Sequence, residues 1–279
     1  MLKQKALSST NRQGLLPNLI IIGAMKCGTS SLHQYLNLHP QIHMSNMKEL
    51  DFFIQEKNWN KGLSWYQSNF CESAQIIGEA SPNYTKYPMF QDVPRKIYQL
   101  VPQAKLIYIL RDPIKRIVSH YSHQYTDRCE FRTISEALSS NLIENHYVNC
   151  SRYYLQLEQF IPYFPIEKIL VISLESLSKN PKKTLDKAFD FLEVDSFDHN
   201  DFLKVFHQSN EKKRLTSLGS WVTKLPAGGR LRGVIPGLES AVEKPKLETS
   251  IYQKLAGFLA EDVEKLKKLT GHSFPEWSI

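Results

Sequence analysis

The sequence predicts an α/β fold in which a central parallel sheet is covered by helices on both faces. Short, continuously apolar runs such as Leu19–Ile22 are typical of strands that are buried on both sides. Helical patterns separate these runs, and alternation of strands with helices favours a parallel sheet. The chain has 279 residues, of which 42% are hydrophobic and 23% charged, so it can form one large α/β domain or two small ones.

Strands and helices are expected to alternate along most of the chain. Apolar runs predict strands at residues 19–22, 75–77, 105–110 and 169–173. Apolar residues at helical spacing predict a helix from near Thr29 to His39-Pro40, and further helices at 93–100, 114–125, 153–164, 181–192 and 250–269. No second domain is indicated.

Two regions of the chain, residues 1–16 and 210–246, lack this alternation of strands and helices. Residues 1–16 are expected to be a flexible segment, and residues 17–279 to form a single domain. Between residues 210 and 246, glycine, proline and basic residues replace the periodic pattern, which predicts a long loop or lid over the site described below.

Composition limits the environment and the partners. The N-terminus lacks the apolar run of a secretory signal, and no run approaches the ~18 apolar residues of a membrane span. The four cysteines form no CxxC pair and are too sparse for a disulfide scaffold, so we expect a cytoplasmic protein. The net charge of +7 favours anionic partners, which include nucleotides, sulfated sugars, nucleic acids and acidic lipids.

A glycine-bounded loop follows the first predicted strand. It reads Gly23-Ala-Met-Lys26-Cys-Gly28-Thr29-Ser30 and opens a helix, so its backbone N–H groups and the positive helix end can hold a phosphate. The spacing nearly satisfies the triphosphatase pattern G-x-x-x-x-G-K-[ST], but its lysine lies at position 26 and Thr29 occupies the usual lysine position. The structural alternative is an ordinary turn between a strand and a helix.

A second strand leads into a second polar segment. Arg111 follows the strand 105–110, at the end of the sheet where open α/β folds bind ligands, and its planar guanidinium suits phosphate oxygens. Ser119 lies about 12 Å further along the following helix at ~1.5 Å per residue. The alternatives are an ion pair between Arg111 and Asp112 or another acid, and an incidental helix position for Ser119.

These two segments together resemble the PAPS-dependent sulfotransferases, whose donor is 3′-phosphoadenosine-5′-phosphosulfate (PAPS) and whose product is PAP. The chain is most similar to the heparan sulfate (carbohydrate) type, as a soluble, bacterial-like member. Residues 21–32 (IIGAMKCGTSSL) resemble the 5′-phosphosulfate loop of that family, and residues 110–121 (LRDPIKRIVSHY) its 3′-phosphate motif. The segments 48–53, 62–66 and 78–84 and Tyr153 also match, and the resemblance runs from about residue 17 to residue 194.

The resemblance implies a P-loop nucleotide-kinase-like, three-layer fold and in-line sulfuryl transfer to a hydroxyl or amine. It implies that Lys26 neutralises the leaving phosphate and that Arg111 and Ser119 bind the 3′-phosphate. The residues implied in donor binding are Lys26, Cys27, Gly28, Thr29, Ser30, Ser31, Arg111, Ser119, Tyr153, Lys212, Lys213 and Arg214. We expect no metal, since the sequence shows no convincing cluster of metal ligands and such transfers depend on positioning and electrostatics.

The resemblance also implies that Glu49 is the general base, because the segment beginning at Glu49 aligns with the one that supplies the catalytic glutamate in heparan-type enzymes. The alternative is a surface glutamate paired with Lys48. Histidine is the base in the small-molecule branch of the superfamily, so His123 is the second candidate. Three other side chains compete for the role, namely Asp51, Glu79 and His43.

The acceptor is expected to be a sugar or glycolipid precursor, or a small natural product. Heparan-type enzymes often have a lysine where this chain has Ala80, and a C-terminal disulfide loop that this chain lacks; both differences argue against a polyanionic glycan. Five aromatic residues could line an acceptor pocket but fit a core better, namely Phe52, Phe53, Trp59, Trp65 and Tyr66.

Two other functions are considered. A P-loop kinase or triphosphatase would need a lysine directly after Gly28 and a strand-end aspartate for magnesium. A nucleic-acid-binding protein is suggested by the net charge alone, and no helix-turn-helix, zinc or RNA-binding motif accompanies it. The sequence predicts no nucleic-acid partner and indicates no oligomeric state.

Overall fold

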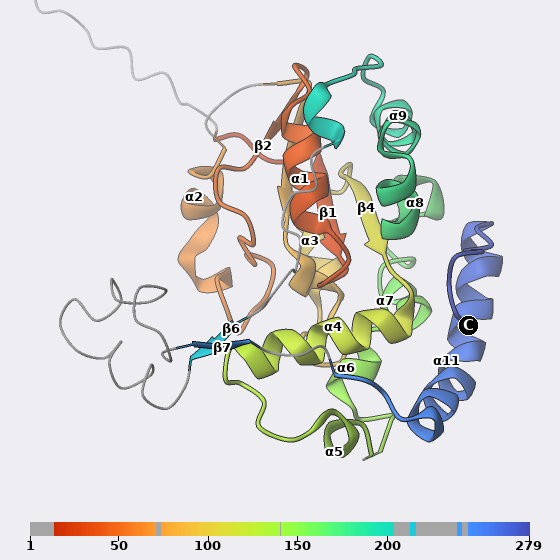
Figure 1. Cartoon of the computed structure of the whole chain (residues 1–279). Helices are drawn as coiled ribbons and strands as arrows, with labels where there is room; N and C mark the ends of the chain where they lie inside the picture. Colours follow the sequence, from red (N-terminus) through yellow and green to blue (C-terminus); the bar gives the residue numbers. More distant parts are fainter. Residues whose placement is uncertain (1–13, 71–73, 140, 204–212, 216–238, 242–244) are drawn as a thin grey trace, which may run out of the picture.

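A five-stranded parallel sheet forms the centre of the protein (Figure 1). The computed structural model describes residues 14–70, 74–139, 141–203, 213–215, 239–241 and 245–279. The strands lie in the order β2-β3-β1-β4-β5, and each neighbouring pair is parallel. Their bounds are β1 Leu19–Gly23, β2 Ile42–Met44, β3 Ile76–Ala80, β4 Lys105–Leu110 and β5 Ile169–Ser173.

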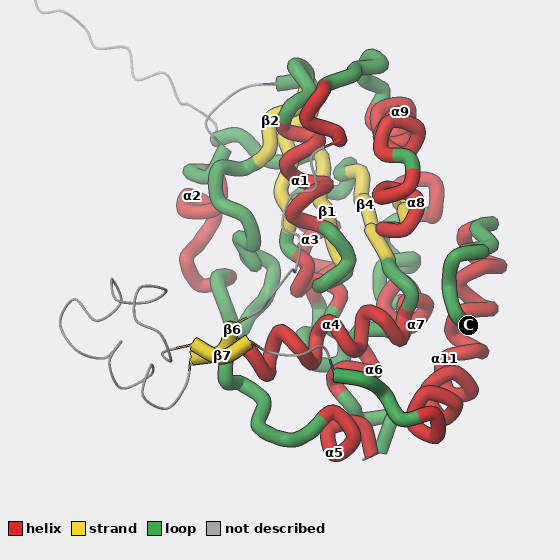
Figure 2. Tube along the Cα trace, viewed as in Figure 1, coloured by secondary structure: helices red, strands yellow, loops and turns green. Residues whose placement is uncertain are grey.

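Helices cover both faces of this sheet (Figure 2). The helix bounds are α1 Thr29–Asn37, α2 Gly62–Gln67, α3 Val93–Leu100, α4 Pro113–Thr126, α5 Ile134–Ser139, α6 His146–Asn149, α7 Tyr153–Glu158, α8 Leu174–Lys179, α9 Pro181–Leu192 and α11 Thr249–Thr270. Short 3₁₀ turns lie at Trp59–Lys61, Pro82–Thr85, Ile166–Lys168 and Asn200–Leu203. Helix α4 crosses the end of the sheet at which β1 and β4 finish (Figure 1).

Alternate residues of β1 divide the core into two layers. Leu19 and Ile21 pack in the cluster that includes side chains of α1 and α9, whereas Ile20 and Ile22 pack with those of α3, α7 and α11. All four β1 side chains are fully buried. This alternation follows from the period of two in a strand, and it confirms the predicted three-layer arrangement around a parallel sheet.

The structure confirms each predicted strand and helix, with changes at some ends. The strand predicted at residues 75–77 extends to Ala80, and the helix predicted at 153–164 ends at Glu158. Beyond that helix the chain continues in turns that still bury Phe160 and Phe164, which is why the apolar spacing looked helical. Strand β2 was not predicted, because three residues with a histidine in the middle give no recognisable pattern.

Part of the segment expected to be flexible is packed. Leu15 and Leu16 lie against the core, and the Gln67 side chain donates a hydrogen bond to the carbonyl of Gly14 (2.9 Å). Two leucines next to a strand can bury apolar surface, so the packed domain begins earlier than residue 17. Residues 1–13 lie outside the described residues.

The predicted lid, residues 210–246, is described only in part. Residues Lys213–Leu215 (β6) and Glu239–Ala241 (β7) form an antiparallel pair, and β6 contacts α4. The other residues from 210 to 244 lie outside the described part of the chain. Among the helices that the structure describes, none combines the length and apolar character needed to cross a membrane.

Candidate active site

A cleft of about 520 Å³ lies where the loop after β1, the end of β4 and helix α4 meet. It is lined by most of the site residues predicted from the sequence, which are Lys26, Gly28, Thr29, Ser30, Ser31, Glu49, Arg111, Ser119 and His123. These residues come from segments almost a hundred positions apart, so the fold brings the two predicted phosphate motifs and both candidate bases to one place.

The loop after β1 leaves the N-terminus of α1 open toward the cleft. Gly28 is the N-cap of α1 with φ 90°, and no side chain caps the helix. A Cβ atom at Gly28 would lie 2.7 Å from Cδ1 of Leu174, so a larger residue fits neither the backbone angle nor the space. Helices α4 and α9 are capped by Asp112 and Asn180 instead. The first N–H groups of α1 are therefore available to an anion.

Lys26 extends the positive surface of this loop. Its backbone has φ 72°, its side chain is half-buried in the cleft, and no hydrogen bond or ion pair holds its ammonium group among the described residues. Burial lowers the pKa of Lys26 below its ordinary value; Asp127 opposes that shift, and Arg111 and Arg116 add to it. Desolvation and neighbouring positive charge both make an anionic ligand favourable here.

Cys27 and Tyr153 lie beneath the loop rather than in the cleft. Both are fully buried, and the Cys27 sulfur lies 3.6 Å from the Tyr153 hydroxyl. That hydroxyl donates a hydrogen bond to the Arg111 carbonyl (2.7 Å). Burial raises the pKa of the Cys27 thiol to about 11, so it stays protonated at neutral pH. These two side chains connect the loop after β1 to the end of β4 instead of lining the binding surface.

Arg111 and Ser119 both line the cleft, and their side chains make no hydrogen bond or ion pair among the described residues. The alternative pairing of Arg111 with Asp112 is not found. Asp112 is buried, where its carboxylate accepts hydrogen bonds from the backbone N–H groups of Lys115 (2.8 Å) and Ser278 (2.7 Å). The guanidinium of Arg111 is thus left for a ligand.

Arg116 was not identified from the sequence, although it lies in the same motif. Its guanidinium is fully buried and donates hydrogen bonds to the carbonyls of Met25 (3.1 Å) and Tyr147 (3.0 Å) and to the hydroxyl of Ser151 (3.2 Å). It therefore fixes the loop that carries Lys26 against α4. An arginine between the apolar residues Ile114 and Ile117 of a helix was the available signal.

Glu49 lines the cleft. Its backbone N–H donates to the carbonyl of Ala80 (2.9 Å), and its carboxylate is paired with Lys48 at 2.8 Å. Burial acts to raise the pKa of Glu49, but the hydrogen bond and charge of Lys48, with Lys86 and Lys57, bring it below its ordinary value. The ion pair that was considered as an alternative role is present, and the same residue lines the cleft.

His123 faces the cleft from α4, with its Nδ1 atom 3.1 Å from a carboxylate oxygen of Asp127. The other competing bases lie elsewhere. Asp51 is buried and accepts hydrogen bonds from Asn83 (2.7 Å) and Lys57. Glu79 is fully buried on β3, and His43 does not line the cleft. Glu49 and His123 remain as the two candidates.

The five aromatic residues belong to the core, which is the role that the sequence favoured, and they form no acceptor pocket in the cleft. Phe52, Phe53 and Tyr66 are buried, and the rings of Phe52 and Tyr66 are stacked with centroids 4.2 Å apart. Trp59 and Trp65 are partly buried against the same cluster. None of the five lines the cleft, so burial of large apolar surface decides their placement.

The predicted basic segment is described only at its backbone. Lys212 lies outside the described residues, and Lys213 and Arg214 belong to β6. Since β6 contacts α4, this backbone passes near the helix that carries Ser119 and His123. A role for the three side chains in nucleotide binding stays a prediction.

Comparisons with known proteins agree with this geometry. Residues 16–223 match the model of the sulfotransferase domain. The chain is 32% identical over 190 residues to human heparan sulfate glucosamine 3-O-sulfotransferase 5, an alignment that covers 64% of this chain and 54% of that protein. It is 28% identical over 267 residues to the human 3-O-sulfotransferase 3B1, covering 93% of this chain and 64% of that protein.

Among solved structures, the crystal structure of a sulfotransferase from Alicyclobacillus acidocaldarius has the same fold. The TM-score is 0.69 at 24% identity, and the match covers 95% of this chain and all of the other. This confirms the predicted P-loop-like, three-layer fold. The chain spans only about half the length of the first curated relatives that it matches. Since the domain match covers well over half of the sequence, the protein belongs to the sulfotransferase family.

Proposed function

We propose that the protein transfers the sulfuryl group of PAPS to a hydroxyl or amine of an acceptor and releases PAP. The observation that carries this proposal is a single cleft that joins an uncapped helix N-terminus to two cationic side chains without partners among the described residues, Lys26 and Arg111. A nucleotide with phosphates at both its 5′ and 3′ positions requires two separate anion sites, and the cleft offers two.

The loop and α4 would hold the two ends of the donor. The N–H groups of Thr29, Ser30 and Ser31 suit the 5′-phosphate, and Arg111 with Ser119 suits the 3′-phosphate. Leu174 and Phe202 supply an apolar wall that suits a purine ring. Such a site contributes mainly by fixing the donor in the orientation needed for in-line attack.

Lys26 would act on the leaving group. When the bond between sulfur and the bridging oxygen breaks, negative charge develops on the 5′-phosphate. A desolvated ammonium group at that point stabilises the charge more strongly than water does. The lysine is placed within the loop and not after Gly28, so it can meet the bridging oxygen directly.

Glu49 would accept the proton of the acceptor as its oxygen or nitrogen bonds to sulfur. The pKa of Glu49 is lowered by Lys48 despite burial, so the carboxylate is ionised at neutral pH and ready to accept a proton. His123 lines the same cleft and is the alternative base. If Glu49 is the base, Glu49→Gln should be inactive; if His123 is the base, His123→Ala should be inactive.

A carbohydrate or a small natural product is the acceptor class that we propose. The named substrates of the curated relatives are heparan sulfate glucosamines, which supports a sugar. Ala80 is fully buried and adds no positive charge where heparan-type enzymes often have a lysine, which favours an acceptor of lower charge than a polysulfated glycan. The cytoplasmic location expected from the sequence is part of the same proposal, and cell fractionation tests it.

Arg111 provides the test of donor selection. Calorimetry should show that Arg111→Ala weakens PAP by roughly 1.5–3 kcal/mol, while the same nucleotide without its 3′-phosphate is bound almost as before. Lys115→Ala is the matched control, since Lys115 is an exposed cation four residues further along, in the first turn of α4. Equal losses for both nucleotides would show that Arg111 does not read the 3′-phosphate.

A further inference from the structure

Three side chains of the kind that bind metals meet at the contact between α4 and α6. His120 lies on α4, His146 is the first residue of α6, and Cys150 follows its last turn. One potential ligand atom from each lies within 4.8 Å of the other two. His120 and Cys150 are buried and His146 is partly exposed, so the cluster has one side toward solvent.

His120 is the residue that most needs a partner. It is fully buried, and neither of its ring nitrogens makes a hydrogen bond. Its surroundings are the rings of His146 and Tyr147, with centroids 5.1 and 5.0 Å away. A buried polar group without a partner is costly, and coordination of a metal would satisfy one of these nitrogens.

The spacing of the other two residues places them on one side of a helical turn. His146 and Cys150 are four residues apart, and the Cys150 sulfur lies 3.7 Å from Nδ1 of His146. Bonds of about 2.0 Å to nitrogen and 2.3 Å to sulfur put tetrahedral ligand atoms about 3.3–3.5 Å apart. Side-chain rotations that move the ligand atoms by about 1 Å would therefore convert the observed cluster into a tetrahedral coordination shell.

The charges around the cluster restrict the ion that it can hold. Two cationic side chains, Lys86 and Arg116, lie near His146. Their positive charges oppose a highly charged complex. Two neutral imidazoles and one thiolate give a complex with a single positive charge for Zn²⁺ and a neutral one for Cu⁺.

We propose that His120, His146 and Cys150 bind one soft metal ion, Cu⁺ or Zn²⁺. On binding, the Cys150 sulfur gives up its proton to solvent and bonds to the metal, and no oxidation or reduction of the protein is involved. Thiolate and imidazole ligands select these two ions over Mg²⁺ or Ca²⁺. The cationic neighbours favour Cu⁺. The site is separate from the proposed sulfuryl transfer and does not depend on it.

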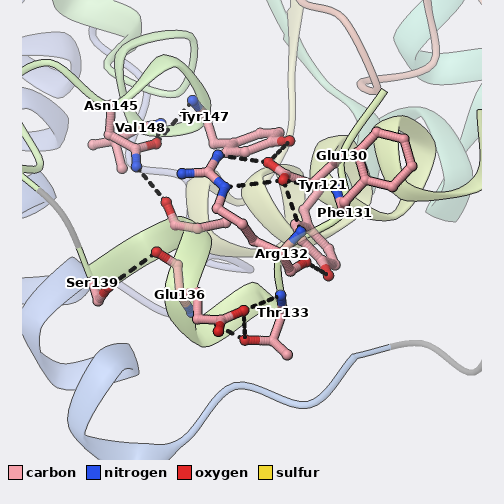
Figure 3. A network of polar contacts seen from close by, with 11 residues as sticks. Tyr121, Glu130, Phe131, Arg132, Thr133, Glu136, Ser139, Asn145, Tyr147 and Val148 are labelled. Atoms are coloured by element: carbon pink, nitrogen blue, oxygen red, sulfur yellow. Dashed lines mark hydrogen bonds and ion pairs between the residues drawn. The ribbon is translucent and has the colours of Figure 1, made fainter. Parts of the chain in front are cut away.

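The fold braces helix α6, whose first residue is His146 and whose C-cap is Cys150. The Tyr147 hydroxyl donates to the carboxylate of Glu130 (3.0 Å), and Arg132 makes two hydrogen bonds to the same carboxylate (3.0 and 2.7 Å; Figure 3). Asn145 caps α6 through the N–H groups of Tyr147 and Val148. Ligands on a braced element lose little further freedom when a metal binds.

Metal binding by the full chain tests the proposal. The reduced protein, stripped with a chelator, is incubated with Zn²⁺ in one arm and with Cu⁺ under anaerobic, reducing conditions in the other. Bound metal is measured by mass spectrometry after desalting, and affinity by competition with a chromophoric chelator. We expect about one ion per chain, a higher melting temperature with metal, and a thiolate-to-cobalt absorption band when Co²⁺ is used as the probe.

Variants assign the ion to these residues. Cys150→Ser and His146→Ala should each weaken metal binding by more than ~100-fold. Loss of a residue that only hydrogen-bonds to a metal ligand already costs ~10–100-fold, and these variants remove a ligand itself. Cys129→Ser and His272→Ala, which change residues outside the cluster, should bind as the unaltered chain does. Circular dichroism of the metal-free variants reports whether they fold. The proposal is overturned if neither ion binds stoichiometrically, or if folded Cys150→Ser and His146→Ala retain full affinity.

Discussion

Lys26 is the side chain on which the proposed chemistry depends most. Its backbone has a positive φ, which residues other than glycine rarely adopt. Its ammonium group is partly removed from water and has no hydrogen-bond or ion-pair partner among the described residues. Both features cost stability, and such costs concentrate at functional sites. The position is therefore better explained by a ligand than by folding.

Lys26→Ala should slow sulfuryl transfer by ~10²-fold or more at saturating PAPS, through loss of charge stabilisation on the leaving group. The fold should be retained, since alanine and lysine carry the same strain at this φ. PAP release in single-turnover assays measures the rate, and Lys115→Ala is the control. A near-normal rate in a folded Lys26→Ala would remove Lys26 from the mechanism.

Glu49→Gln should reduce the transfer rate by about 10²–10⁴-fold, since the amide keeps the shape of the carboxylate and loses its basicity. PAP affinity should be nearly unchanged. His123→Ala, assayed in parallel, should retain much more of the rate. The reverse result, an active Glu49→Gln and an inactive His123→Ala that still binds PAP, would make His123 the base.

The residues of the cleft were largely predictable because short motifs encode them. Gly28, Thr29 and Arg111 each follow a recognisable strand, and parallel strands deliver their ends to one edge. Arg116 and the cluster of His120, His146 and Cys150 were missed, because they act through contacts between elements that the sequence does not place side by side. The spacing of His146 and Cys150 was visible, but its third member lies on a different helix.

Among the elements, the segment after α4 is held by one buried carboxylate. Glu130 accepts hydrogen bonds from the Arg132 guanidinium, from the Tyr147 hydroxyl and from the N–H groups of Phe131 and Arg132 (Figure 3). The bonds from Arg132 lower the pKa of Glu130 to about 2, against the opposing effect of burial, and Tyr147 and the N–H groups add to that shift. The carboxylate joins this segment to α6.

Glu130→Gln should lower the free energy of unfolding at neutral pH by about 1–3 kcal/mol. The folded pKa of about 2 lies below the ordinary value of 4.5, so this stabilisation is complete above pH ~4.5 and is lost as the pH falls toward 2. Urea unfolding between pH 2 and 7 measures it. The difference between the unaltered chain and the variant should shrink over that window.

Glu136→Gln is the matched control for this experiment. Glu136 is exposed and accepts hydrogen bonds from Thr133 at the start of α5, an arrangement that glutamine can keep. Its stability profile should follow that of the unaltered chain. A Glu130→Gln protein with the same profile as this control would show that the network does not support α6.

At the scale of the whole molecule, positive charge without partners gathers around one cleft. Lys26, Arg111 and the buried Lys86 have no ion pair among the described residues, and the hydrogen bonds of buried Arg116 go to uncharged oxygens. The chain carries a net charge of +7. Mutual repulsion of these groups opposes folding, and a bound anion relieves it.

Anions should therefore stabilise the protein more than ionic strength alone explains. At PAP concentrations near 100 times its dissociation constant, stability should rise by ~2.7 kcal/mol, which corresponds to about 5–10 °C in melting temperature for a domain of this size. Sulfate or phosphate should act in the same direction more weakly, with chloride at equal ionic strength as the control. A variant with both Lys26→Ala and Arg111→Ala should lose the response; if it keeps the response, the anions act elsewhere.

The fold of the whole molecule could be predicted from local sequence patterns, but the residues that contact the acceptor could not. Buried strands and amphipathic helices repeat with simple periods, so the parallel sheet and its two covering layers were predictable. The aromatic residues 52, 53 and 66 have no period that distinguishes a pocket from a core, and packing decides between them. Strand β2 was not predicted because it is stabilised by pairing with β3, which lies more than 30 residues further along the chain.

The hydrogen bond from Ser278 to Asp112 has a consequence for synthesis of the protein. Asp112 follows Arg111 directly, so the strand end that carries the arginine obtains its final neighbours from a residue made 166 positions later. Trp277 adds a contact from its indole N–H to Glu175, whose carboxylate also accepts from the Asp112 N–H. Because these late residues hold Asp112, we expect the arginine side of the cleft to reach its final geometry only after residue 278 has left the ribosome. Donor binding by the nascent chain should therefore follow the release of this segment.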